Sequence, residues 1–324
     1  MPTVPNLTSR RRLATGVAAS ALAAALTVAP HPVQAQAGTA APGTVSTEAI
    51  MADVATLAAD AMAGRDAGSE GGRAAREYIV QRLEGLGFAV EADTFPVPRV
   101  DRRLDAVNVR VRVEGSGHPD RHVVVTAHYD HVGVRNGEIY NGADDNASGV
   151  AALLALAEAL TDEAPQHTMT LVFLDAEEGG LRGARQFVAD APVPLDAVLM
   201  NVNFDMVSRS ERDLWVSGTY PWPELRPIFD RFEAVAPVEL RAGHDTPQDQ
   251  GADNWVMASD HAAFHERGIP FLYFGVADHP DYHRPTDDAE RIDPIWFTAA
   301  VETLLGAVRT VDQSLDGRRP DDAG

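Results

Sequence analysis

Three short apolar runs in the middle of the chain are each followed by acidic or histidine residues. Each run has the length and composition of a buried strand. Because ligands bind at the carboxyl ends of strands in open α/β sheets, we expect the side chains that follow to converge on one edge of a sheet. The runs and the residues after them are 123–125 with His128 and Asp130, 171–174 with Glu177 and Glu178, and 198–200 with Asp205.

Predicted strands and helices alternate along the chain from residue 122 onward. This alternation is typical of an α/β domain in which helices cover both faces of a mostly parallel sheet. The two strands predicted before residue 122 follow each other directly, so we expect them to pair antiparallel and to make the sheet mixed. The sequence therefore predicts a single globular α/β domain. The predicted strands cover 88–95, 107–113, 123–126, 169–174, 197–204 and 270–274, and the predicted helices cover 46–61, 70–86, 147–160, 181–189, 259–267 and 294–311.

The N-terminal segment has the composition of an export signal. Arg10, Arg11 and Arg12 precede an alanine-rich, weakly apolar stretch, and the small residues Ala35 and Ala37 suit cleavage after either one. Paired arginines at this place are typical of a twin-arginine signal, with an ordinary secretory signal and an uncleaved anchor as alternatives. We therefore expect export to the periplasm or the extracellular space. The predicted segments are a signal peptide at 1–37, a linker at 38–45, the main domain at 46–312 and a disordered tail at 313–324.

Composition excludes several kinds of site and partner. The chain has 324 residues, no cysteine and a formal net charge of −21 at pH 7. The absence of cysteine rules out disulfides, thiolate metal ligands and cysteine nucleophiles. Nucleic acids bind to basic surfaces, so the charge argues against a nucleic-acid partner. We also expect no membrane partner, because Thr15, Gly16, Ser20 and Thr27 interrupt the one longer apolar stretch.

The residues after the three runs have the spacing of a metal site. His128 and Asp130 lie two apart at a strand end, so both side chains leave on one face, where the carboxylate can orient a histidine ligand. Glu177 and Glu178 are adjacent and must point in different directions, so that one can bind metal while the other takes a proton. Asp205 follows a buried run, and a buried carboxylate needs a cation or hydrogen-bond donors.

Two further clusters supply candidate ligands. Asp144 and Asp145 lie in a turn just before a predicted helix, where capping of that helix is the other interpretation for Asp144. His283 could supply the last ligand, with Tyr282 before it and Asp287 four residues later. The remaining histidines near the clusters fit a surface or structural role as well as the role of a ligand. These are His131, His261, His265 and His279.

The order and the residues of these clusters resemble the motifs of the M28 family of zinc metallopeptidases, the co-catalytic aminopeptidases of bacterial secretions. The resemblance covers residues 46 to 311, which makes 46–312 a predicted catalytic domain. It implies a zinc-exopeptidase-like fold and a zinc-dependent aminopeptidase that acts on peptides with a free N-terminus. Other motifs that contribute to the resemblance are residues 62–65, 68–72, 259–261 and 268–270.

The resemblance also implies a role for each candidate residue. It implies two zinc ions per chain, with all-nitrogen and oxygen ligands, and a cis peptide bond after Asp145. The implied roles are His128 and Asp205 on one zinc, Glu178 and His283 on the other, Asp145 bridging both, Glu177 as general base, Asp130 orienting His128, and Tyr282 as a hydrogen-bond donor to the oxyanion.

Three other functions stay open at this point. A glutaminyl-cyclase-like acyltransferase shares the implied fold but uses a single zinc, whereas the residues here suit two. A metallo-amidohydrolase of the M20 type carries an inserted lid domain, and no stretch between the clusters is long enough for one. A catalytically inactive binding module of the same fold would have lost ligands. Zinc content and the hydrolysis of a leucine anilide distinguish these functions.

The segment 206–258 matches no motif of the family. Because it lies between two of the clusters, we expect it to shape the substrate pocket. It contains Trp215 and Trp222, for which packing in the core is the favoured interpretation.

Overall fold

A computed structural model of the protein describes residues 45–98, 103–210 and 213–323. The predicted signal peptide (1–37) and nearly all of the predicted linker (38–45) lie outside these residues. None of the helices in the described ranges combines the length and the apolar character that a membrane crossing requires.

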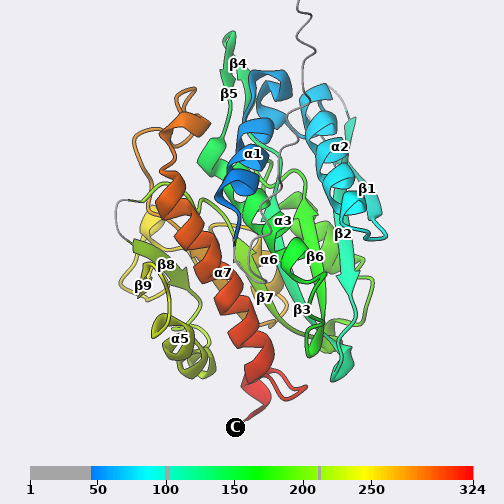
Figure 1. Cartoon of the computed structure of the whole chain (residues 1–324), viewed down its shortest axis with the longest axis vertical. Helices are drawn as coiled ribbons and strands as arrows, with labels where there is room; N and C mark the ends of the chain where they lie inside the picture. Colours follow the sequence, from blue (N-terminus) through cyan, green and yellow to red (C-terminus); the bar gives the residue numbers. More distant parts are fainter. Residues whose placement is uncertain (1–44, 99–102, 211–212, 324) are drawn as a thin grey trace, which may run out of the picture. The chain divides into compact units, whose positions relative to one another are not determined.

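A mixed eight-stranded sheet forms the centre of the domain (Figure 1). Four neighbouring strands, β6, β3, β7 and β10, run parallel, whereas β1 and β2 are antiparallel to their neighbours and β8 is antiparallel to β10. The predicted mixed, mostly parallel sheet is therefore confirmed. In spatial order the strands are β1 (Glu91–Pro98), β2 (Arg103–Val113), β6 (His167–Leu174), β3 (His118–His128), β7 (Val198–Phe204), β10 (Phe271–Gly275), β8 (Asp213–Ser217) and β9 (Glu239–Ala242).

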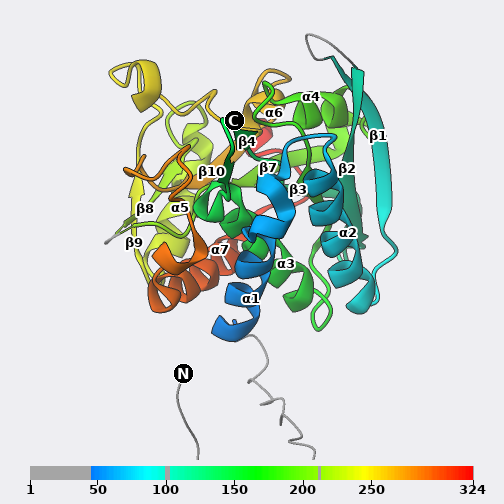
Figure 2. The same cartoon turned by 90° about the horizontal axis from the view of Figure 1, so that it is seen from above.

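Helices cover both faces of this sheet, as Figure 2 shows from above. The alternation of side chains along β3 fixes the two faces, because successive residues of a strand point to opposite sides. Val123 and Val125 join a large apolar cluster with five of the helices, and Val124 joins a smaller cluster with the other two. The first set is α1 (Thr47–Leu57), α2 (Glu70–Gly85), α3 (Gly149–Ala159), α5 (Arg226–Glu233) and α7 (Pro294–Ser314), and the second is α4 (Arg182–Ala189) and α6 (His261–His265).

Side-chain caps explain why three of the helices begin where they do. The hydroxyl of Ser46 accepts a hydrogen bond from the third amide after it, and Ser69 does the same at the start of α2. Asp293 caps α7, and Pro294 follows it at the first helical position, where its missing N–H costs nothing. The predicted helices agree with the observed ones in type and place.

The structure adds elements that the sequence pattern did not predict. A short hairpin of β4 (Gly133–Arg135) and β5 (Glu138–Tyr140) follows β3, and β8, α5 and β9 fill the segment 206–258. Trp215 and Trp222 are partly buried and pack against a cluster that contains Trp255. These contacts agree with core packing for the two tryptophans.

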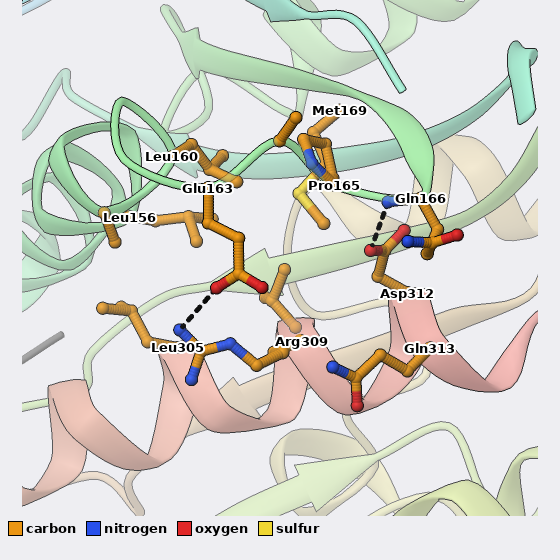
Figure 3. Close-up of a pocket in the computed structure, with 13 residues that line it drawn as sticks. Leu156, Leu160, Glu163, Pro165, Gln166, Met169, Leu305, Arg309, Asp312 and Gln313 are labelled. Carbon is orange, nitrogen blue, oxygen red and sulfur yellow. Dashed lines mark hydrogen bonds and ion pairs between the residues drawn. The ribbon is translucent and has the colours of Figure 1, made fainter. Parts of the chain in front are cut away.

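The C-terminal end of α7 is attached to the start of β6 through Asp312 (Figure 3). The Asp312 carboxylate accepts hydrogen bonds from the amides of Gln166 and His167, at 2.8 and 2.9 Å, and lies 3.0 Å from His167 Nδ1. The chain after α7 continues this contact: the amide of Gly317 donates to His167 Nε2, and Arg319 donates to the carbonyl of Val198. Within the tail predicted to be disordered, 313–324, Gly317 and Arg319 thus have hydrogen-bond partners in the domain.

Replacing Asp312 by alanine is expected to lower the free energy of unfolding by roughly 2–4 kcal/mol, since hydrogen bonds to a charged acceptor are lost and buried donors stay unpaired. Urea unfolding of the purified chain measures the change. The matched control is Arg309→Ala. Arg309 lines the same pocket as Asp312 (Figure 3), and its exposed ion pair with Glu163, at 3.9 Å, contributes little to stability. Equal unfolding midpoints for the two variants would show that Asp312 does not hold the helix to the sheet.

Candidate metal centre

A cleft opens at the carboxyl ends of the parallel strands. His128 is the last residue of β3, Glu177 and Glu178 follow β6, and Asp205 follows β7. Because β6, β3 and β7 are parallel neighbours in the sheet, these strand ends lie side by side, as the sequence predicted. The cleft is lined by His128, Asp145, Glu177, Glu178, Asp205, Met206, Ala252, Trp255, Ala258, Tyr273, Val276, Asp278, Tyr282 and His283.

The five predicted ligand residues form two groups that share one carboxylate. In the first group, His128 Nε2 lies 3.2 Å from Asp205 Oδ1 and 3.5 Å from Asp145 Oδ1. In the second group, His283 Nε2 lies 3.0 Å from Asp145 Oδ2 and 3.2 Å from Glu178 Oε1. One ligand atom from each member of a group lies within 4.8 Å of the others. Asp145 therefore directs one oxygen to each group, which is the arrangement of a bridging ligand.

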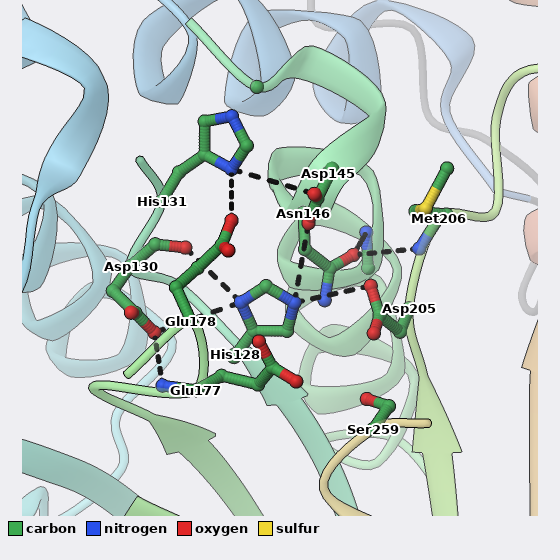
Figure 4. A network of polar contacts seen from close by, with 12 residues as sticks. His128, Asp130, His131, Asp145, Asn146, Glu177, Glu178, Asp205, Met206 and Ser259 are labelled. Atoms are coloured by element: carbon green, nitrogen blue, oxygen red, sulfur yellow. Dashed lines mark hydrogen bonds and ion pairs between the residues drawn. The ribbon is translucent and has the colours of Figure 1, made fainter. Parts of the chain in front are cut away.

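His131 also belongs to the second group, whereas the sequence alone left a surface or structural role equally open for it. Its Nδ1 lies 2.8 Å from Glu178 Oε1 and 3.6 Å from Asp145 Oδ2, and Figure 4 shows the three side chains pointing toward one another. The signal in the sequence is its position just past the end of β3, three residues after His128, with Asp130 between them.

The electrostatics of the cleft favour a cation. Burial alone would lower the pKa of His283, but the nearby carboxylates of Asp145 and Glu178 raise it to about 10. Burial opposes protonation of His128 in the same way, yet the charges of Asp205 and Glu177 raise its pKa well above the ordinary histidine value. Carboxylates in excess of nearby positive charge produce both shifts. Divalent cations held by nitrogen and oxygen ligands would neutralise this field, and such ligands fit zinc.

Glu177 and Glu178 have different surroundings although they are adjacent. Ala176 before them has a left-handed φ of 60°, which turns the chain sharply after β6. Glu178 enters the second ligand group, whereas Glu177 belongs to neither group and lines the cleft. Burial raises the pKa of Glu177 well above the usual carboxyl value, with His128 opposing the shift. A carboxyl group with this placement can accept and return a proton.

Asp130 acts on two neighbours through different atoms. His128 Nδ1 lies 3.1 Å from the backbone oxygen of Asp130 and 3.7 Å from its carboxylate, so the carbonyl is the nearer acceptor. The carboxylate accepts a 2.9 Å hydrogen bond from the amide of Glu177. The Asp130 carboxylate also interacts with the imidazole, so the orientation of His128 by the Asp130 side chain stays a prediction. The backbone oxygen of Asp130 is the nearer acceptor, and the carboxylate also holds the loop of Glu177.

Hydrogen bonds to Asp287 and to Asp144 hold the turn that carries Asp145. Asp287 accepts hydrogen bonds from the amides of Asp144 and Asp145, at 3.1 to 3.2 Å. Asp144 accepts 2.7 Å hydrogen bonds from the amide and the hydroxyl of Ser208 rather than capping a helix. His279 Nε2 lies 3.1 Å from the other oxygen of Asp144. The peptide bond between Asp145 and the next residue is cis, as expected.

Arg65 is the second residue whose role the sequence pattern did not reveal, although it is part of the motif at 62–65. Its side chain is completely buried, and burial lowers the pKa of the guanidinium to about 10, while Asp145 and other acids oppose the shift. Within the described residues, the guanidinium donates only to backbone carbonyls, which belong to the end of α1, the loop after β3 and the turn of Asp145. The acceptors are Leu57, Tyr129, Asn141, Gly142 and Asp145.

Tyr282 lies at the mouth of the cleft, next to the second ligand group. Its ring stacks on the imidazole of His283 with the centroids 4.0 Å apart. Burial raises the pKa of its hydroxyl far above the ordinary tyrosine value, so the group is a donor at neutral pH. The stacking fixes the direction of both side chains.

Comparisons with known proteins agree with this geometry. The sequence profile of "Peptidase family M28" matches residues 108–308. Glutaminyl-peptide cyclotransferase of Bos taurus is 27% identical over 268 residues, which cover 70% of this chain and 72% of that protein. Aminopeptidase YwaD of Bacillus subtilis is 30% identical over 208 residues, covering 59% of this chain and only 41% of the relative.

The fold is also found among solved structures. A zinc aminopeptidase from Bacillus subtilis superposes with a TM-score of 0.68 at 17% identity, covering 85% of this chain and 97% of that one. At this identity the likeness concerns the fold, and it agrees with the predicted zinc-exopeptidase-like architecture.

Proposed function

The chain belongs to peptidase family M28, and on this premise we propose that it is a zinc-dependent aminopeptidase that removes N-terminal residues from peptides. The proposal includes two zinc ions per chain. The observation that carries it is the pair of ligand groups that share Asp145, with Glu177 beside them in the same cleft. The relative that is named as an aminopeptidase supports it.

Five side chains would hold the two ions. When bound, a pair of zinc ions lowers the pKa of a bound water toward about 7 and polarises the carbonyl group of the substrate. His128 and Asp205 would bind one ion, Glu178 and His283 the other, and Asp145 would bridge them through its two oxygens.

Glu177 and Tyr282 supply the remaining chemistry of the proposal. Glu177 takes a proton from the attacking water and later gives it to the nitrogen of the leaving amine. Asp130 keeps Glu177 in place through the hydrogen bond to its amide. Tyr282 donates a hydrogen bond to the oxygen that becomes negative as the carbonyl carbon turns tetrahedral.

The acidic lining of the cleft suits a substrate with a protonated α-amino group. Glu177, Asp205 and Asp278 line it, and the net charge of the chain is −21. Asp260, a further candidate for this contact, is fully buried and is not among the residues that line the cleft. We therefore place the amine beside Glu177 and Asp205 rather than Asp260.

Acetylating the substrate amine is expected to lower kcat/KM by roughly 10²-fold or more, because the contact is lost and the acidic groups stay unpaired. The measurement compares a leucyl peptide with its N-acetyl twin at equal zinc and pH. A parallel series with chelator establishes that the activity depends on metal. Equal rates on the two peptides would refute the aminopeptidase assignment and point to another amide hydrolase.

Glutaminyl cyclisation is the second candidate function, because a relative at 27% identity carries that name. In that reaction the α-amine attacks the side-chain carbonyl of an N-terminal glutamine and releases ammonia, and no peptide bond is cleaved. A glutaminyl-leucine substrate therefore separates the two functions. An aminopeptidase releases free glutamine and leucine, whereas a cyclase produces ammonia and an intact pyroglutamyl peptide.

We also propose that the chain is exported. The paired arginines at Arg10 and Arg11 and the small residues up to Ala37 support a cleaved signal. In this proposal the catalytic domain covers 46–312 and acts on peptides in the periplasm or the extracellular space, without a nucleic-acid or membrane partner.

A further inference from the structure

His131 is buried at the centre of the second ligand group, although the function proposed above gives it no role. Its side chain has no solvent exposure, whereas that of His283 in the same group is 39% exposed. The two imidazoles are not stacked, since their planes meet at 59° with the centroids 5.6 Å apart. They therefore approach Glu178 and Asp145 from different directions.

The contact between His131 and Glu178 is a close ion pair whose angles are not those of a hydrogen bond. His131 Nδ1 and Glu178 Oε1 lie 2.8 Å apart, yet neither atom has a hydrogen-bond partner anywhere in the described part of the chain. Buried polar atoms in proteins are almost always paired. His131 Nδ1 and Glu178 Oε1 thus lie close together without hydrogen-bond partners, and both lie near Asp145. This arrangement suits two atoms that bind the same metal ion rather than each other.

The separations of the ligand atoms suit a tetrahedral ion. With bonds of about 2.0–2.1 Å, the ligand atoms of a tetrahedral zinc lie about 3.3–3.4 Å apart. The four measured separations among His131 Nδ1, Asp145 Oδ2, Glu178 Oε1 and His283 Nε2 are 2.8, 3.0, 3.2 and 3.6 Å. All four atoms lie within 4.8 Å of one another.

The backbone also makes room for the imidazole. Gly142 has a left-handed φ of 56°, and a side-chain carbon on it would lie only 2.5 and 2.6 Å from Cδ2 and Cγ of His131. No other residue type fits this position without moving the ring.

We propose that His131 is a fourth protein ligand of the metal position formed by Asp145, Glu178 and His283. The inference rests on the proposed function, which supplies the zinc. Structural zinc sites are closed by four protein ligands, whereas catalytic sites keep a position open. The position with His131 is then closed, and the one formed by His128, Asp145 and Asp205 keeps a place for water or substrate. The two positions therefore bind metal with unequal affinity.

The test is metal binding by the full chain rather than catalysis. Metal-free wild type and His131→Leu are titrated with Zn²⁺ against a chromophoric chelator, and with Co²⁺ while the visible spectrum is recorded. The control is His167→Leu, which also removes a buried histidine but lies at the opposite end of the sheet, paired with Asp312. Circular dichroism checks folding, and His131→Gln replaces the leucine variant if that variant does not fold.

We expect two unequal affinities in the wild type and in His167→Leu. In the His131 variant we expect the affinity of the tighter metal position to fall by roughly 100-fold or more. Even residues that only support a metal ligand change metal affinity by about 10–100-fold. The tetrahedral cobalt spectrum of the first equivalent is lost with it. Unchanged affinities and spectra in the His131 variants would overturn the inference.

The outcome for the wild type separates this inference from the proposed function. If the wild type binds a single metal, the two-zinc proposal fails, and the His131 variants still decide whether that metal contacts His131. If the wild type binds no metal, both the two-zinc proposal and the inference about His131 fail.

Discussion

Replacing Glu177 by glutamine is expected to lower kcat by roughly 10²–10⁴-fold, the usual effect of removing a general base. The amide keeps the shape of the side chain but cannot accept the proton of the attacking water. Because Glu177 belongs to neither ligand group, the variant should retain the metal content of the wild type. Turnover of a leucyl anilide and zinc analysis on the same preparation measure both properties.

Glu178→Gln is the matched control, since it makes the same chemical change one residue away. This variant should lose metal as well as activity, because Glu178 lies 3.2 Å from His283 and 2.8 Å from His131 in the second group. If instead Glu177→Gln loses zinc and Glu178→Gln keeps it, the two glutamates have been assigned the wrong way round.

Replacing Arg65 by methionine is expected to prevent stable folding. The variant leaves several buried carbonyls without donors, at about 1–3 kcal/mol for each, and the sum is comparable to the whole stability of a typical domain. Arg65→Lys keeps the charge but has fewer donors, and we expect an intermediate loss because lysine lacks the planar fork. Urea unfolding gives the order of stabilities.

Arg185→Met is the control for Arg65, because it removes an arginine whose side chain is 52% exposed and whose ion pair with Glu266 is 3.3 Å long. The expected change for an exposed pair is within about 0.5 kcal/mol. A stability of Arg65→Met close to that of Arg185→Met would mean that water or a shifted backbone satisfies the carbonyls.

The parts of the fold that the sequence predicted are those with strong local signals. Buried runs such as 171–174 mark the central strands, and residues such as Ser69 and Asp293 mark the starts of helices through side-chain caps. The place of the candidate site could be predicted from the central strands, because parallel neighbouring strands bring their carboxyl ends together. Strands β8 and β9 have only five and four residues, and their pairing beyond β10 depends on long-range contacts that no local pattern records.

His131 and Arg65 were missed for a different reason. His131 follows the end of β3 in a loop, where the direction of a side chain depends on the hairpin and on the space at Gly142 rather than on strand alternation. Arginine is almost always at least partly exposed in proteins, so complete burial of Arg65 contradicts the expectation for its type. Both residues act through contacts that form only when distant segments meet.

The hydrogen bonds of Arg65 have a consequence for where this enzyme can be shortened. The family profile begins at residue 108, yet Arg65 connects the last residue of α1 to the carbonyls of Gly142 and Asp145. A fragment that starts at the profile boundary would contain all five predicted zinc ligands but would lack the group that holds the turn of Asp145. A shortened chain therefore has to begin before Arg65 to keep this turn in place, and trimming that removes Arg65 is expected to abolish activity although every predicted ligand remains in the chain.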